Sequence, residues 1–165
     1  MIIVRRIEID YGHTLPKHFG FCNQIHGHRG IIECHFEGDI NNDFYDSKNG
    51  MVMDFSVCKR IMMREIHSVL DHGFAIWNRL DIDHFLVETN EVIEDDNTTI
   101  RVSTLDFIRA RNEKILQLDD PPTAEILAKY FFKKINNALD GMPDKIKLKE
   151  LHWWETPNNK AIAKE

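Results

Sequence analysis

The feature that most constrains the fold is a two-residue alternation that follows the pair His26 and His28. In residues 28–37, apolar side chains alternate with polar or charged ones. The apolar set is Ile32, Cys34 and Phe36, and the polar set is Glu33, His35 and Glu37. Side chains two residues apart leave the same face of an extended strand, so the pattern predicts a β-strand with one face in the core. We therefore expect Cys34 to be a buried thiol and His35 to be a solvated strand residue.

The same spacing lets His26 and His28 direct their imidazoles toward one ion. Zinc accepts neutral imidazole nitrogens and takes no geometric preference from its d-electrons, so it is the metal that the pair favours. Cys22 lies four residues before His26, where it could be a third ligand or a free thiolate near the metal. His13 follows a predicted strand over residues 2–10, where it could be a ligand or a surface histidine.

Two amphipathic helices are expected, over residues 56–70 and 123–139, because apolar residues recur in both at helical spacing. Ser56 and Thr123 are the predicted N-caps, since each carries a side-chain oxygen just before its helix. In the first helix, Cys58 falls on the apolar stripe and is expected in the core.

A last strand is predicted over residues 146–156. Ile146 and Leu148 share one phase, whereas Leu151, Trp153 and Glu155 share the other. One extra residue in the strand would reconcile the two phases, so a β-bulge is expected near Lys149 or Glu150.

Residues 79–120 form a charged stretch without a sustained period. A short strand over residues 99–103 and a short helix over residues 109–118 are the elements expected within it. The last strand is expected to pair near residues 99–107 or with a strand that the pattern does not reveal between the helix of 123–139 and residue 146.

Composition limits the kinds of partner. A chain of 165 residues suggests one domain. The net charge of −6 argues against nucleic acid, whose binders usually show a basic stripe. No apolar run reaches the length of a membrane span, and the first residues lack a signal-peptide pattern. Three cysteines, an odd number without framework spacing, suit reduced thiols and a cytoplasmic location.

Six short motifs occur in one order along the chain. They are Asp10-Tyr11-Gly12-His13, Cys22-Asn23-Gln24-Ile25-His26-Gly27-His28, Gly50-Met51-Val52-Met53-Asp54-Phe55, Leu70-Asp71-His72, Pro122-Thr123-Ala124-Glu125 and Glu155-Thr156. Each is weak alone, but together they resemble the 6-pyruvoyl-tetrahydropterin synthase family over nearly the whole chain. The three-residue gap between Cys22 and His26 resembles the branch that makes 6-carboxy-5,6,7,8-tetrahydropterin.

The resemblance implies a single domain over residues 1–165 of class α+β. Its fold would be the tunnelling fold (T-fold), a four-stranded antiparallel sheet with two helices on one face. Residues 79–120 would be an insertion relative to compact members. The resemblance also implies a homo-oligomer, a hexamer built as two stacked trimers, and an exposed sheet edge would suit such pairing.

The resemblance also implies the roles of the site residues. Zn²⁺ would be held by His13, His26 and His28. Cys22 would be the catalytic general base, and His72, oriented by Asp71, would carry the second proton. The substrate-binding residues would be Thr123, Glu125 and Glu155, with Glu155 gripping the pterin.

The implied reaction converts 7,8-dihydroneopterin triphosphate to 6-carboxy-5,6,7,8-tetrahydropterin, with release of triphosphate and acetaldehyde, in 7-deazaguanine (queuosine-type) biosynthesis. Alternatives are a synthase that makes the 6-pyruvoyl product and a non-catalytic pterin- or zinc-binding relative. A cupin-like metal enzyme is a further alternative, because Glu33 follows the histidine pair, but the two expected helices argue against it.

Overall fold

The computed structural model of this chain describes residues 1–78, 86–87, 102–103, 110, 114–142 and 145–165. Their main feature is a curled six-stranded sheet whose strands lie in the order β6-β3-β1-β2-β7-β8. The strands are β1 (Ile2–His13), β2 (His26–Glu37), β3 (Gly73–Trp77), β6 (Ile115–Leu118), β7 (Lys147–Thr156) and β8 (Asn159–Lys164). A separate pair consists of β4 (Leu86–Val87) and β5 (Val102–Ser103).

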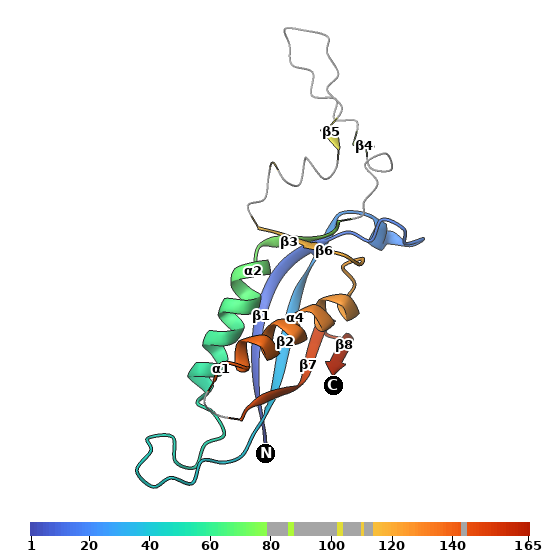
Figure 1. Cartoon of the computed structure of the whole chain (residues 1–165). Coiled ribbons are helices and arrows are strands. Elements are labelled where there is room, and N and C mark those ends of the chain that lie inside the picture. Colours follow the sequence, from blue (N-terminus) through green and yellow to red (C-terminus); the bar gives the residue numbers. More distant parts are fainter. Residues whose placement is uncertain (79–85, 88–101, 104–109, 111–113, 143–144) are drawn as a thin grey trace.

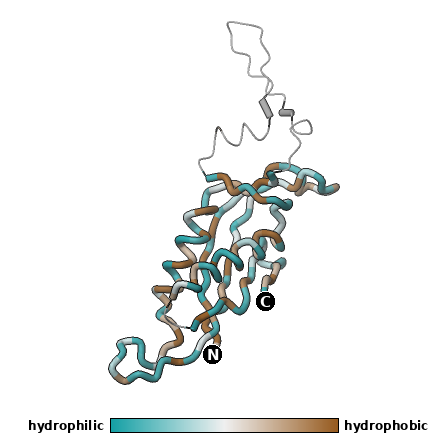
Figure 2. The backbone as a smooth tube through the Cα atoms, viewed as in Figure 1, coloured by the Kyte–Doolittle hydropathy of each residue, from teal (hydrophilic) through white to brown (hydrophobic). Residues whose placement is uncertain are grey.

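The helices cover one face of this sheet (Figure 1). They are α1 (Phe55–Met62), the π-helical turn η2 (Met63–His67), α2 (Ser68–Leu70) and α4 (Ala124–Leu139), and a 3₁₀ turn, η1 (Phe21–Asn23), precedes β2. Hydrophobic and hydrophilic residues are interspersed along helices and strands, as expected for elements that bury one side (Figure 2). The α+β class and the T-fold prediction are therefore confirmed in their main features.

The strand count and direction differ from the prediction. The described sheet has six strands instead of four, and it is mixed, because β3 runs parallel to both β1 and β6. Strand β3 was missed because its residues from Gly73 to Ile76 are all buried, so no alternation marks it. Strand β8 pairs with the outer side of β7, so the partner expected between residues 139 and 146 is wrong. Of the region near residues 99–107, the described residues 102–103 pair with β4 instead.

Strands β1 and β2 form the centre of the sheet. They pair antiparallel from Ile2 opposite Glu37 to His13 opposite His26, and each reaches further toward the histidines than predicted. The bulge expected in β7 is confirmed at Lys149, because His35 pairs with Glu150 while Phe36 pairs with Leu148.

The core lies between the sheet and the helices. Cys34 and Cys58 are fully buried there, as predicted. Trp153 is also fully buried; it stacks on Phe131 at a centroid distance of 5.4 Å, and its Nε1–H donates to the Tyr11 hydroxyl at 3.1 Å. This aromatic group fixes β7 and β1 against α4, directly below the site described next.

The N-cap of the first helix lies two residues before the predicted one. Asp54, not Ser56, is its N-cap: the Asp54 carboxylate accepts from the Ser56 backbone N–H at 2.7 Å. The prediction for the second helix is confirmed, because the Thr123 hydroxyl accepts from the Ile126 N–H at the start of α4.

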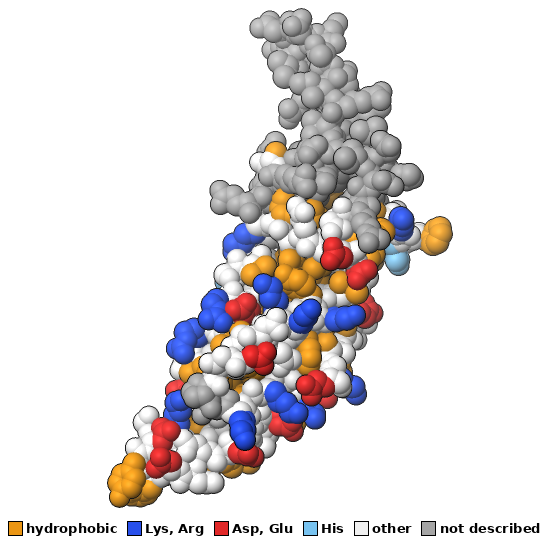
Figure 3. Space-filling model, in the orientation of Figure 1, with side chains coloured by type: hydrophobic (Ala, Val, Ile, Leu, Met, Phe, Trp, Pro, Cys, Tyr) orange, Lys and Arg blue, Asp and Glu red, His pale blue; other side chains and the backbone are white. Residues whose placement is uncertain are grey.

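Lys and Arg side chains are interspersed with Asp and Glu on the face in Figure 3.

Two predictions fall within the charged stretch. The helix expected over residues 109–118 is wrong at its end, where residues 115–118 form β6 beside β3; residues 109 and 111–113 lie outside the described residues. Of the strand expected over residues 99–103, residues 102–103 form β5, and the rest also lies outside the described residues. None of the described helices is long and apolar enough to cross a bilayer.

Candidate metal centre

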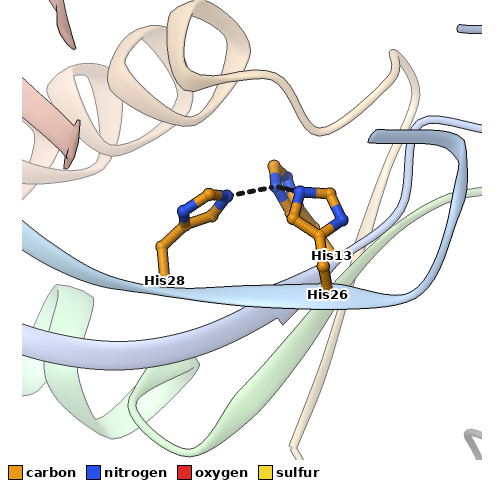
Figure 4. A group of neighbouring side chains, drawn as sticks. All are labelled: His13, His26 and His28. Atoms are coloured by element: carbon orange, nitrogen blue, oxygen red, sulfur yellow. Dashed lines mark hydrogen bonds between the residues drawn. The ribbon is translucent and has the colours of Figure 1, made fainter. Parts of the chain in front are cut away.

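Three imidazoles meet where β1 ends and β2 begins. His13 stands opposite His26 in the strand pairing, and His28 leaves the same face of β2 two residues later. The His13 Nε2 atom lies 3.0 Å from His26 Nε2 and 3.1 Å from His28 Nε2. The rings point toward one another with their nitrogens inward (Figure 4). Thus, the three histidines singled out in the sequence form one cluster that could hold a metal.

Hydrogen bonds on the outer side fix which nitrogen faces inward. His13 Nδ1 lies 2.7 Å from the Pro122 carbonyl oxygen, and His26 Nδ1 lies 2.8 Å from the Gln24 carbonyl oxygen. A carbonyl only accepts, so each Nδ1 carries the hydrogen and each Nε2 presents a lone pair. Lone pairs 3.0 Å apart repel unless a cation lies between them. Zinc–nitrogen bonds of about 2.0–2.1 Å place tetrahedral ligands roughly 3.3 Å apart, so the cluster fits a zinc ion.

Burial favours the neutral form of two of the three rings, His13 and His28. His13 is 1% exposed, and burial lowers its pKa to about 4; the hydrogen bond with Pro122 opposes this shift, and the charges of His26 and His28 add to it. Burial also lowers the pKa of His28, although Glu155 opposes the shift. Neutral imidazole is the form that binds a metal, so the lowered pKa values of His13 and His28 favour metal binding at these two rings.

A carboxylate lies beside the rings. Glu155, near the end of β7, places Oε1 3.5 Å from His13 Nε2 and 3.6 Å from His28 Nε2. Its side chain is 24% exposed. A negative charge next to three inward Nε2 atoms makes the centre attractive to a cation.

Asp71 and His72 form a hydrogen-bonded pair directly after α2, which ends at Leu70. Asp71 Oδ2 lies 2.8 Å from His72 Nδ1, and Asp71 Oδ1 accepts the Asp10 backbone N–H at 3.1 Å. Burial alone would raise the pKa of Asp71, but these two hydrogen bonds and the charges of His67 and His72 lower it overall. His72 has a φ of +55°, which a non-glycine residue adopts at a cost and which often marks a functional position.

Sequence reasoning missed His67. It ends the π-helical turn η2, and its Nε2 lies 3.4 Å from Asp71 Oδ2. π-Helical turns often occur at functional sites, because the extra residue redirects side chains. The four-residue spacing from His67 to Asp71 on a predicted helix was the signal that could have revealed this contact.

Two hollows adjoin the histidine cluster. One, of about 320 Å³, is lined by Cys22 together with the three residues expected to bind substrate, Thr123, Glu125 and Glu155. The other, of about 380 Å³, is lined by His28 and His72. The structure therefore groups Cys22 with the expected substrate residues, and it places His72, which is hydrogen-bonded to Asp71, at the neighbouring hollow.

Comparisons with known proteins agree on one family. The family model for 6-pyruvoyl tetrahydropterin synthase matches residues 2–165. The 6-carboxy-5,6,7,8-tetrahydropterin synthase of Haemophilus influenzae is 26% identical over 95% of this chain and 94% of its own.

Solved structures show the same fold. An uncharacterized protein from Wolinella succinogenes aligns with a TM-score of 0.71 at 20% identity, and 6-pyruvoyl tetrahydropterin synthase from Plasmodium vivax aligns with a TM-score of 0.64 at 20% identity. Both alignments cover 100% of this chain and 98% of the other. Taken with the family model, which spans nearly every residue, this means that the chain belongs to the 6-pyruvoyl tetrahydropterin synthase family.

Proposed function

We propose that this protein is a zinc-dependent lyase that converts 7,8-dihydroneopterin triphosphate to 6-carboxy-5,6,7,8-tetrahydropterin, releasing triphosphate and acetaldehyde. The observation that carries the proposal is the convergence of three imidazole Nε2 atoms beside a hollow lined by a thiol and a carboxylate. The 6-carboxy product is favoured by the spacing of Cys22 and His26 and by the name of the Haemophilus relative. The pathway would be 7-deazaguanine biosynthesis of the queuosine type.

His13, His26 and His28 would hold the zinc ion. When bound, zinc supplies Lewis-acid chemistry that lowers the pKa of a coordinated substrate hydroxyl. The outward hydrogen bonds to Pro122 and Gln24 hold two of the rings in the required tautomer and orientation. These bonds come from backbone carbonyls, so the cluster is preorganised by the fold itself.

Cys22 is the proposed general base. It lies in the 3₁₀ turn η1, just before β2, and lines the same hollow as Glu155, which contacts the histidine cluster. Its thiolate would accept a proton from the substrate side chain near the metal. In this role the sulfur stays off the ion.

His72 is the proposed second proton carrier. Its Nδ1–H donates to Asp71, so its Nε2 is left to accept and release a proton. The lowered pKa of Asp71 keeps the carboxylate ionised, and that charge stabilises His72 when it takes up the proton. His67, on the same carboxylate oxygen, would help hold Asp71 in place.

Glu155 is the proposed pterin anchor. A carboxylate can accept two parallel N–H bonds from the guanidine-like edge of a pterin, which gives both strength and orientation. Glu125 and Thr123 line the same hollow. The Thr123 oxygen already accepts the helix-capping N–H, so its hydroxyl hydrogen remains available to donate to a ligand.

We also propose that the protein is a cytoplasmic homo-oligomer, a hexamer of two trimers as the family resemblance implies. In the described sheet, β6 and β8 are the edge strands, each with one paired neighbour. Such edges are available to pair with another copy. Analytical ultracentrifugation gives the mass directly: a sixfold multiple of the 19.4 kDa chain supports the proposal, and a monomer contradicts it.

The reaction is tested by incubating zinc-loaded protein with 7,8-dihydroneopterin triphosphate and identifying the pterin by mass spectrometry. The 6-carboxy product with acetaldehyde is the expected result. A 6-pyruvoyl product would assign the other synthase reaction to the same site, and intact substrate would indicate a non-catalytic relative.

Matched variants separate the roles. Cys22→Ala should keep the zinc and lose triphosphate release; loss of zinc instead would make Cys22 a ligand. Glu155→Gln should raise KM with the zinc content unchanged, whereas loss of zinc would place that carboxylate on the metal. Cys58→Ala, at a buried thiol far from the hollow in sequence, is a control for thiol removal as such.

A further inference from the structure

A second polar cluster lies on the opposite face of the sheet from the core. Glu33 and His35 leave this face of β2, and Glu150 and His152 leave it on β7. The strand pairing sets Glu33 opposite His152 and His35 opposite Glu150. The bulge at Lys149 produces this register, and the result is a square of two carboxylates and two imidazoles, each pair on a diagonal.

The four side chains are in close contact. The rings of His35 and His152 stack with centroids 4.2 Å apart and planes 26° apart. His152 Nε2 lies 2.8 Å from Glu150 Oε2, and His152 Nδ1 lies 3.6 Å from Glu33 Oε2. The His152 side chain is only 10% exposed. These contacts are independent of the three-histidine centre.

The hydrogen bonds determine which atoms of the square can bind a ligand. Because the Glu150 carboxylate only accepts, His152 Nε2 carries the hydrogen and Nδ1 presents its lone pair toward Glu33. A lone pair and a carboxylate that face each other at 3.6 Å repel unless a cation lies near. One does: the Lys160 ammonium donates to His152 Nδ1 at 3.2 Å.

His35 supplies an atom of the square that is unsatisfied. Its Nε2 is buried and has no hydrogen-bond partner among the described residues, so the expectation that His35 is a solvated strand residue is wrong. Burial lowers the pKa of His35, and the charge of His152 lowers it further, against Glu150 and Glu33, which raise it. An unpaired buried ring nitrogen is costly and calls for a ligand.

Charges around the square decide whether a divalent ion is tolerated. With neutral imidazoles the square carries two negative charges. Arg6 stands opposite Glu33 but pairs with Glu8 at 3.6 Å, and Lys164 stands opposite Glu150. Lys160 is the competitor in the square itself, and its ammonium already lies 4.4 Å from the centre of the Trp154 ring, a contact that does not depend on His152.

We propose that Glu33, His35 and His152 form a second site for a divalent transition-metal ion such as Zn²⁺. The ligands would be a Glu33 carboxylate oxygen, His35 Nε2 and His152 Nδ1, and these three residues offer ligand atoms within 4.8 Å of one another. Glu150 orients His152 from the far side, as an outer carboxylate does for metal-bound histidines. Mixed imidazole and carboxylate ligands suit zinc and its neighbours better than calcium or magnesium. The ion would join β2 to β7 on the face without helices.

The test counts zinc ions on the full chain. Metal-stripped wild type and variants are reloaded with Zn²⁺, passed through a desalting column and measured by native mass spectrometry. Wild type should retain two equivalents per chain and His35→Gln one. His28→Gln, which disables the first centre, should also retain one, and the double variant none. One equivalent in wild type, or two in His35→Gln, overturns the proposal.

Three further variants test the assignment of this second site. Glu33→Gln should lose the same equivalent as His35→Gln, and circular dichroism checks that both remain folded. Glu37→Gln is the matched control, because it lies on the same face of β2 but pairs with Lys147 and Lys149 instead. Lys160→Met should tighten the second equivalent by removing the competing ammonium. Weaker binding in that variant would contradict the assigned ligand atoms.

Discussion

Acidification should destabilise the metal-free protein in part through His13, and the contribution of this residue can be isolated. Its ring is buried, and its pKa is lowered from 6.5 to about 4. Between these two values the unfolded chain binds a proton that the folded chain does not, so the free energy of unfolding falls as the pH falls. Each pKa unit is worth about 1.4 kcal/mol, so the loss amounts to about 3 kcal/mol between pH 6.5 and pH 4.

The assay is urea unfolding of chelator-treated protein at steps from pH 7.5 to pH 4, for wild type and His13→Gln. Glutamine keeps an N–H that can donate to the Pro122 carbonyl but cannot take up the proton. The other titrating groups are common to both proteins, so the stability difference between them isolates His13. That difference should shrink by about 3 kcal/mol as the pH falls, which for a domain of this size is a shift of roughly 6–12 °C in Tm. Parallel pH profiles for the two proteins would refute the reasoning.

Three further predictions concern the scaffold. Asp54→Ala should cost about 1 kcal/mol of unfolding free energy in urea titrations, because it removes the cap of α1, whereas Ser56→Ala should change it by only a few tenths; equal losses would contradict the cap assignment. Tyr11→Phe should cost about 1–3 kcal/mol, because the buried Trp153 N–H loses its acceptor, and an unchanged urea midpoint would count against that bond. Deleting Lys149 should leave soluble, folded protein by circular dichroism, because it removes only the extra residue of the bulge and keeps Leu148 opposite Phe36 and Glu150 opposite His35; loss of folded protein would contradict the bulge assignment.

Periodicity predicted the elements that bury one face. The side chains of β1, β2 and α4 alternate between the core and the solvent, so the residue pattern was sufficient to predict these three elements. Strand β3 is buried on both faces, and β8 buries mainly the small residues Ala161 and Ala163 against the core, so neither shows a strong alternation. The strand count was therefore underestimated at the two sides of the sheet.

The sequence pattern did not predict which side chains on neighbouring strands contact each other. His26 and His28 were placed together by their spacing, but the neighbours of His35 lie on β7, more than a hundred residues away, so it was expected to face solvent. The cap of α1 was misplaced for a local reason. Asp54 and Ser56 are both good capping residues, and only the extended backbone of Asp54 shows which of them starts the helix.

The central claim is that three inward Nε2 atoms share one zinc ion while the cysteine stays off it. A crystal of the zinc-loaded protein, measured on both sides of the zinc absorption edge, tests it most directly. We predict an anomalous peak about 2.0–2.1 Å from Nε2 of each of His13, His26 and His28. A peak bound to the Cys22 sulfur, or a map without density between the three rings, would contradict the account.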